Sequence, residues 1–342
     1  MKVRLTEIAQ RAGVSVSTVS RVLNEKPGVN QHTRRQVLTA IDVLGYDRPS
    51  RLRPRAAGLV GLIVPELENP FFPRFAQLVE SNLAGFGYTP VLCSQSLGGV
   101  HEDDYVQMLQ EHAVSGIIFV SGIHAIHDSD PSRYSRLVEM GLPIVLVNGY
   151  LAGVPAPFLS TDDARSVELA VNHLRQLGHD RIGIALGQAR YTPVIRKAAA
   201  FTSLMRRSEA VLADEEIETL ISRTTYTVEG GVAAAQRLLD VGVTAIVCGS
   251  DVMALGVIRA VRAAGLRVPE DVSVVGSDDS LMTEFTDPPL TTVRQPAAGL
   301  ATAACRTLLD QISGHAVTPG DVIFQPELVL RGSTAKAPAP LA

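Results

Sequence analysis

The segment AGVSVSTVSRVLN at residues 12–24 decides the fold of the amino-terminal region. Gly13 tolerates the left-handed backbone of a tight turn, and Ser15 can cap a helix over 16–24. The apolar residues of that helix recur at helical spacing and define an inward face: Val19, Val22 and Leu23. This segment therefore predicts a short helix that follows a glycine turn.

Two further helices flank this segment. Upstream, we expect Thr6 to cap a first helix that carries Glu7 near its positive end. Downstream, Asn30 can cap a third helix over 31–45. Two short helices around a turn, closed by a third helix, indicate a helix-turn-helix domain, whose second helix enters the major groove of DNA.

The charge of the chain supports a partner that is a polyanion. The 342 residues have a net charge of −4. Residues 1–57 hold eleven Lys and Arg against four Asp and Glu, a net charge of +7, which leaves −11 on the remainder. Clustered Lys and Arg neutralise phosphates and release counterions. The alternative is a charge run on a solvated face without a ligand.

The stretch LTEIAQRAGVSVSTVSRVLNEKPGVNQHTRRQVLTAIDVLGY at 5–46 resembles the DNA-binding head of the LacI/GalR family of bacterial transcription regulators. The resemblance implies that three exposed residues read bases: Val16, Ser17 and Arg21. Arg21 can donate two hydrogen bonds to guanine, whereas Val16 can only pack on a thymine methyl or a sugar edge. Four polar residues match groups that contact DNA phosphates: Ser15, Thr18, Asn24 and Thr33. For Ser15 and Thr33 the alternative is helix capping within the protein, and both roles are compatible.

The hinge or linker at 47–57, DRPSRLRPRAA, is shorter than in most members of that family. The family's hinge helix pushes a leucine into the minor groove, and Leu52 is the candidate for that role. Pro54 would interrupt a longer helix. Arg51 and Arg53 can follow phosphates or enter a narrow minor groove. The alternative is a flexible, solvated linker.

Residues 58–333 alternate short apolar runs with amphipathic stretches. Most runs are apolar throughout, as in parallel strands covered on both faces: 59–65, 89–94, 116–121, 143–149, 181–187, 244–250 and 272–279. The stretches between them suit crossover helices at 72–86, 103–112, 164–177, 228–241 and 254–264. The pattern predicts an α/β core of doubly wound parallel sheets behind an all-α head of residues 1–46. We expect the tail over 334–342, which ends in AKAPAPLA, to be frayed.

Segments such as NPFF (69–72), LPIVLVN (142–148) and PPLTTVRQP (288–296) are similar to the effector-binding core of the same family, which resembles periplasmic binding proteins. The resemblance implies two lobes, the first from about 58–157 and 296–322, the second from about 158–290 and a last strand near 327–332. Ligands of open α/β sheets lie beyond the carboxyl ends of strands. The effector residues implied by the resemblance are Phe72, Asn148, Arg196, Ser250, Asp278 and Gln295.

Arg196 and Asp278 are expected to face each other in the cleft. The guanidinium can donate to vicinal hydroxyls of a sugar while the carboxylate accepts from them. Phe72 can stack on the apolar face of a pyranose. The alternative for Arg196 and Asp278 is a mutual salt bridge that closes an empty cleft.

Two positions depart from the family pattern. Ser250 replaces an asparagine, so a hydrogen bond to the ligand is lost or mediated by water. Ser277 replaces an aromatic residue, which predicts a roomier pocket that fits a disaccharide better than a monosaccharide. Together with YDRP (46–49) and PELENPFFPRFAQLVE (65–80), these features resemble actinobacterial maltose- or oligosaccharide-responsive repressors.

Several classes of function find no support in the sequence. It contains no GxGxxG or GxxxxGK[ST] for nucleotides, no GxSxG and no HExxH. The eight histidines have no metal-ligand spacing with the cysteines, and we expect no metal and no cofactor. Cys93, Cys248 and Cys305 fit no disulfide framework and indicate a reducing cytosol, and no apolar run reaches about 18 residues. The sequence predicts a cytoplasmic protein that is not an enzyme and does not enter a membrane.

The sequence favours a homodimeric repressor of transcription. It would bind a pseudo-palindromic double-stranded operator and release it when a small sugar, a mono- or disaccharide, enters the cleft. A co-repressor response, or a purine or other non-sugar effector, remains an alternative. A competing class is a solute-binding protein whose basic head has no specific DNA target.

Overall fold

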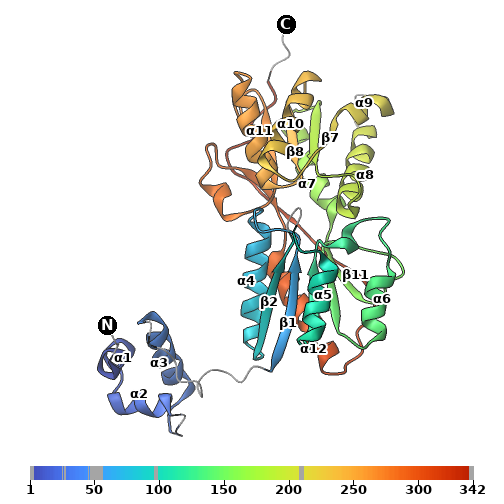
Figure 1. The fold of residues 1–342 in the computed structure, drawn as a ribbon. Helices are drawn as coiled ribbons and strands as arrows, with labels where there is room; N and C mark the ends of the chain where they lie inside the picture. Colours follow the sequence, from blue (N-terminus) through green and yellow to red (C-terminus); the bar gives the residue numbers. More distant parts are fainter. Residues whose placement is uncertain are drawn as a thin grey trace. The chain divides into compact units, whose positions relative to one another are not determined.

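The structure, a computed structural model, describes residues 4–24, 26, 28–44, 46, 57–95, 99–207 and 212–338. The chain divides into two compact units, residues 1–57 and residues 58–342, both drawn in Figure 1. Within the described ranges no helix is long and apolar enough to cross a membrane. The three cysteines are buried and form no disulfide.

The first unit has the predicted helix-turn-helix. Its helices are α1 (Leu5–Ala12), α2 (Val16–Leu23) and α3 (Gln31–Val43). Their apolar faces meet in one small core: Ile8, Ala9, Val19, Val22, Leu23, Val37, Ala40 and Ile41. Burial of these side chains holds three helices that would each be too short to persist alone.

The turns of the head follow the expected capping residues with one exception. Gly13 adopts a left-handed φ of 64°, and the Asn30 side-chain oxygen accepts the Thr33 backbone N–H at 2.7 Å. The prediction that Thr6 caps α1 is wrong, because the helix already begins at Leu5. The Glu7 carboxylate accepts the backbone N–H of the residue before that helix at 3.2 Å, which satisfies its amino-terminal end.

The first lobe of the second unit is built on six parallel strands in the order β11-β5-β4-β3-β1-β2. They are β1 (Gly58–Val64), β2 (Tyr88–Ser94), β3 (Gly116–Val120), β4 (Ile144–Val147), β5 (Pro157–Thr161) and β11 (Gly320–Phe324). One face is covered by α4 (Phe71–Ala84) and α12 (Ala297–Ile312), the other by α5 (Glu102–Glu111) and α6 (Ser132–Glu139). Helices on both faces explain why the central strands β1, β3 and β4 are apolar throughout.

The second lobe has a sheet of the order β12-β10-β9-β8-β6-β7. Its strands are β6 (Ile182–Leu186), β7 (Ile221–Arg223), β8 (Ala245–Cys248), β9 (Ser273–Asp278), β10 (Thr291–Arg294) and β12 (Glu327–Val329). β12 runs antiparallel to β10, and the other neighbours run parallel. The helices of this lobe are α7 (Asp163–Gln176), α8 (Thr192–Arg206), α9 (Asp214–Thr219), α10 (Val228–Asp240) and α11 (Asp251–Ala263).

Three crossovers connect the two sheets: β5 to α7, β10 to α12, and β11 to β12. The two lobes separate clearly in Figure 1, with β1, β2 and α4–α6 in one and α7–α11 in the other. The predicted lobe boundary at 157–158 is wrong, because β5 pairs with β4 and β11 and so belongs to the first lobe. The crossover therefore follows Thr161.

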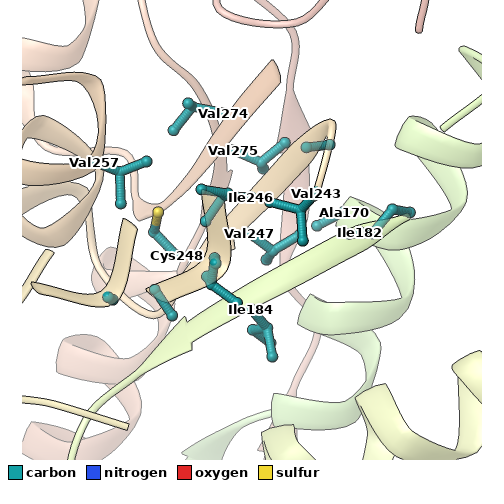
Figure 2. Packing of buried hydrophobic residues seen from close by; sticks show 14 of the residues in the cluster. Ala170, Ile182, Ile184, Val243, Ile246, Val247, Cys248, Val257, Val274 and Val275 are labelled. Atoms are coloured by element: carbon teal, nitrogen blue, oxygen red, sulfur yellow. The ribbon is translucent and has the colours of Figure 1, made fainter. Parts of the chain in front are cut away.

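Figure 2 shows the core of the second lobe, where the middle strands supply most of the buried side chains. Ile184 of β6, Ile246 of β8 and Val275 of β9 lie together, and Val257 of α11 packs against them. Each labelled residue in that view is nearly inaccessible to solvent. The core thus holds the strand ends, where the polar site lies, on a rigid base.

The expectation of a frayed tail is wrong for its first residues. Ala335 donates its backbone N–H to Ser273 Oγ at 3.0 Å, and its carbonyl lies 3.0 Å from His179 Nε2. Ala337 N–H donates to the carbonyl of Leu177 at 2.9 Å. These main-chain bonds fix residues 334–337 on the second lobe, and residues 339–342 lie outside the described part of the chain.

Helices α10 and α11 make their closest approach at glycines. A Cβ atom added to Gly256 would lie 2.0 Å from the carbonyl oxygen of Val228, and one added to Gly231 would lie 2.1 Å from that of Met253. Because both obstacles are backbone atoms, neither helix can make room by turning a side chain.

We expect Gly256→Ala to lower the free energy of unfolding by about 1–3 kcal/mol, since the two helices must separate. Gly299→Ala in α12 is the matched control, because its new Cβ would meet only Phe324 atoms at 3.7 Å and alanine favours a helix. Urea unfolding of both variants measures the difference. Equal midpoints would contradict the close packing.

Candidate effector cleft and DNA-binding face

One side of α2 is free of contacts with the core of the head. Val16 is 41% exposed, and Ser17 and Arg21 are also exposed, whereas Val19 and Val22 on the opposite side are fully buried. The structure thus brings the three residues expected to read bases onto one surface. A guanidinium and a hydroxyl on an exposed helix face can form hydrogen bonds to base edges in a major groove.

The residues expected to contact phosphates already form hydrogen bonds within the head. Ser15 Oγ accepts the Thr18 N–H at 3.2 Å and lies 2.9 Å from Thr18 Oγ1, so it caps α2. Asn24 Nδ2 donates to the Ser20 carbonyl at 2.8 Å at the other end of that helix. The Thr33 backbone is held by the cap of α3. Leu52, Arg51 and Arg53 of the predicted hinge lie outside the described residues.

The polar centre of the second unit is Asp278, the last residue of β9. Its carboxylate accepts hydrogen bonds from Gln295 Nε2 at 2.6 Å and from Asn69 Nδ2 at 3.4 Å. Gln295 lies on the crossover from β10 to α12, and its Oε1 accepts from Thr161 Oγ1 at 2.9 Å. Since Asn69 and Thr161 belong to the first lobe, this chain of hydrogen bonds joins the lobes at the carboxyl ends of their strands.

Burial raises the pKa of Asp278 well above the usual range of a carboxyl group, and the neighbouring charge of Asp251 raises it further. The amide of Gln295 and the charge of Lys197 oppose part of this shift. Asp251 is itself buried and accepts the Ser280 N–H at 2.7 Å. A carboxyl group with a raised pKa can both donate and accept when a hydroxyl-rich ligand reaches it.

Asp278 lies on a backbone turn that few residues adopt. Its φ is 114° and that of Asp279 is 54°, and such conformations cost on the order of 1–3 kcal/mol each. The Asp279 carboxylate points away from the cleft and accepts from Arg294 Nε at 2.7 Å and Arg331 Nη2 at 2.7 Å. The two adjacent carboxylates therefore do not form an acid–base pair, and Asp279 anchors the turn.

Lys197 of α8 reaches the same region from the side. Its ammonium donates to the carboxylate of Asp163, the first residue of α7, and both side chains are nearly buried. Burial lowers the pKa of Lys197, but the charges of Asp163, Tyr226 and Asp278 outweigh it and raise the pKa overall. The Tyr226 ring covers the end of β6 so closely that a Cβ on Gly187 would lie 2.1 Å from it.

Arg196 does not face Asp278, contrary to the prediction. Its Nη2 donates to the carboxylate of Asp321 on β11 at 3.1 Å. Consecutive residues of an α-helix point about 100° apart, so Arg196 turns toward the first sheet when Lys197 points into the cleft. The cation whose charge acts on Asp278 is therefore Lys197.

The other expected effector residues have partners of their own. Phe72 is 8% exposed and packs edge to face on Phe71, with ring centroids 5.5 Å apart, so its ring belongs to the core of the first lobe. Asn148 Nδ2 donates to Ser121 Oγ at 2.6 Å. Ser250 caps α11 by accepting a main-chain N–H. None of these three side chains bonds to Asp278 among the described contacts.

The two lobes are closed against each other on both sides of Asp278. Arg74 Nη1 donates to the Asp279 carbonyl at 3.3 Å, and the His127 N–H donates to the Arg190 carbonyl at 2.9 Å. A cavity of only about 10 Å³ remains within the second lobe beside this region, and residues on its wall include Ser166, Val167, Lys197, Cys248, Gly249 and Ser277. Ligand pockets usually measure about 300–1,000 Å³, so a disaccharide needs the lobes to open.

Beneath the first-lobe side of the cleft lies a buried histidine, His124. Its Nε2 donates to the carbonyl of Val147 at 3.0 Å, just before Asn148. Its backbone N–H donates to the Tyr134 hydroxyl, which donates to Glu102 at 2.5 Å. Burial lowers the pKa of His124 to about 4, so the ring is neutral at pH 7 and supports the end of β4.

The sequence pointed to only part of this site. Lys197 was missed because nothing in the sequence says which of two adjacent basic residues points inward. Asn69 could have been predicted as a site residue, because it is the first residue of the NPFF segment and directly precedes a helix. Asp163 could have been found as an acidic residue directly after a buried strand. Within the described residues no group of His, Cys, Asp and Glu side chains is arranged to hold a metal ion.

Comparisons with known proteins identify the class to which this architecture belongs. Residues 4–49 match the family described as "Bacterial regulatory proteins, lacI family", and residues 171–334 match a periplasmic binding protein-like domain. The regulator MalR of Streptomyces coelicolor is 54% identical over 99% of this chain and 98% of its own length. The chain belongs to the lacI family and is a DNA-binding transcriptional regulator, not an enzyme.

Solved structures agree with this assignment. The regulator CelR in complex with cellobiose is 31% identical, with a TM-score of 0.71 over 97% of this chain and 100% of that one. The lac repressor dimer bound to operator and the anti-inducer ONPF is 28% identical, with a TM-score of 0.69 over 98% of this chain and 100% of that one. The expected head and two-lobed core are confirmed by these likenesses.

The histidine beneath the cleft makes stability depend on pH. The pKa of His124 is about 4 in the folded protein and near 6.5 when unfolded, so the unfolded state binds more protons between these values. The free energy of unfolding should be highest above pH 6.5 and fall by up to roughly 3 kcal/mol as the pH drops toward 4.

Urea unfolding of wild type, His124→Gln and His315→Gln at pH 7.5 and 4.5 measures this dependence. His124→Gln should lose part of the pH slope, whereas His315, whose side chain is 73% exposed, is the matched control and should keep it. An unchanged slope in His124→Gln would mean that other groups cause the acid sensitivity.

Proposed function

We propose that this regulator is a repressor that reads its operator with the exposed face of α2. The observation that carries this proposal is the division of that helix into a buried apolar side and an exposed side with Val16, Ser17 and Arg21. Arg21 would donate to guanine, and Val16 would pack on a thymine methyl. Ser15, Thr18, Asn24 and Thr33 would position the head on phosphates.

We also propose a homodimer, in which two heads bind the two halves of a pseudo-palindromic operator. Support comes from the likeness to the lac repressor dimer and from an exposed apolar surface on the second lobe. Leu281, Met282 and Phe285 are 75%, 52% and 80% exposed. Arg262 of α11 donates to the Asp287 carbonyl at 2.6 Å, which joins this segment to α11. A second copy of the chain would cover it.

The effector we propose is a small sugar, a mono- or disaccharide, bound around Asp278. The carboxylate and amides there offer acceptors and donors to ring hydroxyls. The names of two similar proteins, MalR and the CelR–cellobiose complex, are consistent with a sugar. Lys197 would take the donor role first assigned to Arg196, and Asn148 and Ser250 would contact the ligand after the lobes rearrange. We propose a cytoplasmic location, because the operator DNA lies there.

Coupling between sugar and operator follows from the joined lobes. Gln295 lies on a crossover and bonds to both Asp278 and Thr161, so a ligand that competes for Asp278 changes how the lobes are held. A sugar that binds better to the arrangement unable to hold the operator releases the operator and acts as an inducer. By linkage, bound operator lowers the affinity for the sugar by the same factor by which the sugar lowers the affinity for the operator.

A co-repressor response is the second candidate. In that case the sugar would bind better to the arrangement that holds the operator and would raise the affinity for the operator. A purine is the alternative effector, because a carboxylate and an amide also recognise ring nitrogens. The solute-binding alternative is set aside, because the match to the lacI family covers the head itself. Operator affinity with and without each ligand class separates induction from co-repression.

For the head, Arg21→Ala should relax specificity at one base pair and weaken operator binding by about 1–3 kcal/mol, because a bidentate contact is lost. The measurement compares operator recovered by genomic pull-down with random duplex. Arg35→Ala, an exposed arginine of α3, is the control and should weaken both duplexes alike. Equal losses for Arg21→Ala on the two duplexes would refute base reading.

For the cleft, Asp278→Ala should abolish the response of operator binding to sugar, because it removes the acceptor for ligand hydroxyls. A hydrogen bond to a charged group contributes about 1.5–3 kcal/mol, so calorimetry should show sugar binding weakened at least about tenfold. Asp271→Ala, a carboxylate in the same lobe that pairs with Arg267, should induce normally. Induction that survives Asp278→Ala would place the effector elsewhere.

A further inference from the structure

The second-lobe wall of the cleft contains an ammonium group that is already neutralised. Lys197 donates to Asp163, and their side chains are only 13% and 3% exposed. We infer that this ion pair is a charge filter, which prevents Lys197 from binding an anion and restricts the effector to uncharged molecules. The inference rests on the proposed effector role of the cleft and specifies the charge class of its ligand.

The other cations described around the cleft are also engaged. Arg196 donates to Asp321. Arg294 and Arg331 both donate to Asp279, behind the turn that carries Asp278. Arg74 is exposed and donates to a main-chain carbonyl at the rim. A phosphate inside the closed cleft would therefore find no buried cation without a carboxylate partner among the described residues.

The remaining charges of this wall are negative. Asp278 is buried at the centre of the cleft and Asp251 lies behind it. With Asp163 balanced by Lys197, the wall carries no net positive charge whether Asp278 is ionised or protonated. An anionic ligand would lose its hydration against these carboxylates and gain no opposite charge, which is strongly unfavourable in a buried site.

An uncharged polyol meets none of these costs. Its hydroxyls can donate to Asp278 and accept from Lys197, whose ammonium has three protons and uses one for Asp163. The ion pair thus leaves a directed donor in the cleft and removes the net charge that would attract phosphates. An apolar pair at these positions would exclude anions too, but would offer no donor to a sugar.

The test is Asp163→Asn in the full-length chain, which frees the charge of Lys197. Calorimetry with glucose 6-phosphate, glucose and maltose should show that wild type prefers the uncharged sugars. The variant should bind glucose 6-phosphate at least about tenfold more tightly than wild type, a gain that shrinks as salt is added. Asp163→Ser serves if the asparagine variant fails to fold, because the side-chain cap of α7 is Asp162 and stays in place.

Two controls isolate the filter. Asp214→Asn frees Arg206 at the far end of α8, the helix that carries Lys197. Because the Arg206–Asp214 pair is exposed, this variant should not create phosphate binding. Asp163→Asn with Lys197→Met should reject glucose 6-phosphate again. Wild type that binds glucose 6-phosphate as tightly as glucose, or a folded Asp163→Asn that gains nothing, would overturn the inference.

The outcomes also separate this inference from the proposed function. If wild type binds maltose or glucose and the folded variant gains no affinity for glucose 6-phosphate, the sugar effector stands and the filter fails. If wild type binds no sugar but Asp163→Asn gains glucose 6-phosphate, the filter stands and the sugar proposal fails.

Discussion

The hydrogen bond from Gln295 to Asp278 is the interaction on which the junction of the two lobes depends. Gln295 lies on one of three crossovers and also accepts from Thr161, at the end of a first-lobe strand. Asp278 in turn accepts from Asn69 of the first lobe. One buried carboxylate therefore holds groups from both sheets, and any ligand that reaches it competes directly with contacts between the lobes.

The cost of burying that carboxylate explains much of its surroundings. Two consecutive residues with positive φ are retained because Asp279 is held by two arginines and Asp251 holds the next N–H. The cation that faces the site, Lys197, is balanced by Asp163. A polar network of this kind is stable only when each member has a partner, so its arrangement is sensitive to a single new ligand.

Much of the fold could be predicted from the sequence, and the misses have physical causes. The seven apolar runs all form strands because burial on both faces requires continuous apolar residues. β7 and β10 were not predicted, since strands of three or four residues with polar members leave no periodic signal, whereas the strand expected near 327–332 is β12. β5 was assigned to the wrong lobe because strand pairing is a non-local property.

Within the candidate site, the sequence identified Asp278 and Gln295 as polar groups at strand ends and crossovers, and the structure joins them. It could not tell Arg196 from Lys197, because one residue along a helix changes the direction by about 100° and only the packing of α8 decides which side chain enters the cleft. It also could not reveal that Phe72 packs into the core or that residues 334–337 are held on the second lobe.

By itself, the amino-acid sequence determined the two parts of this protein and their class: a basic helix-turn-helix head and an acidic α/β core. Those properties are carried by local signals, namely capping residues, helical periodicity, apolar runs and charge. Only the tertiary structure decided which charges are paired, to which lobe each strand belongs and which cation faces Asp278. Such choices depend on contacts between residues far apart in the chain, and no local pattern encodes them.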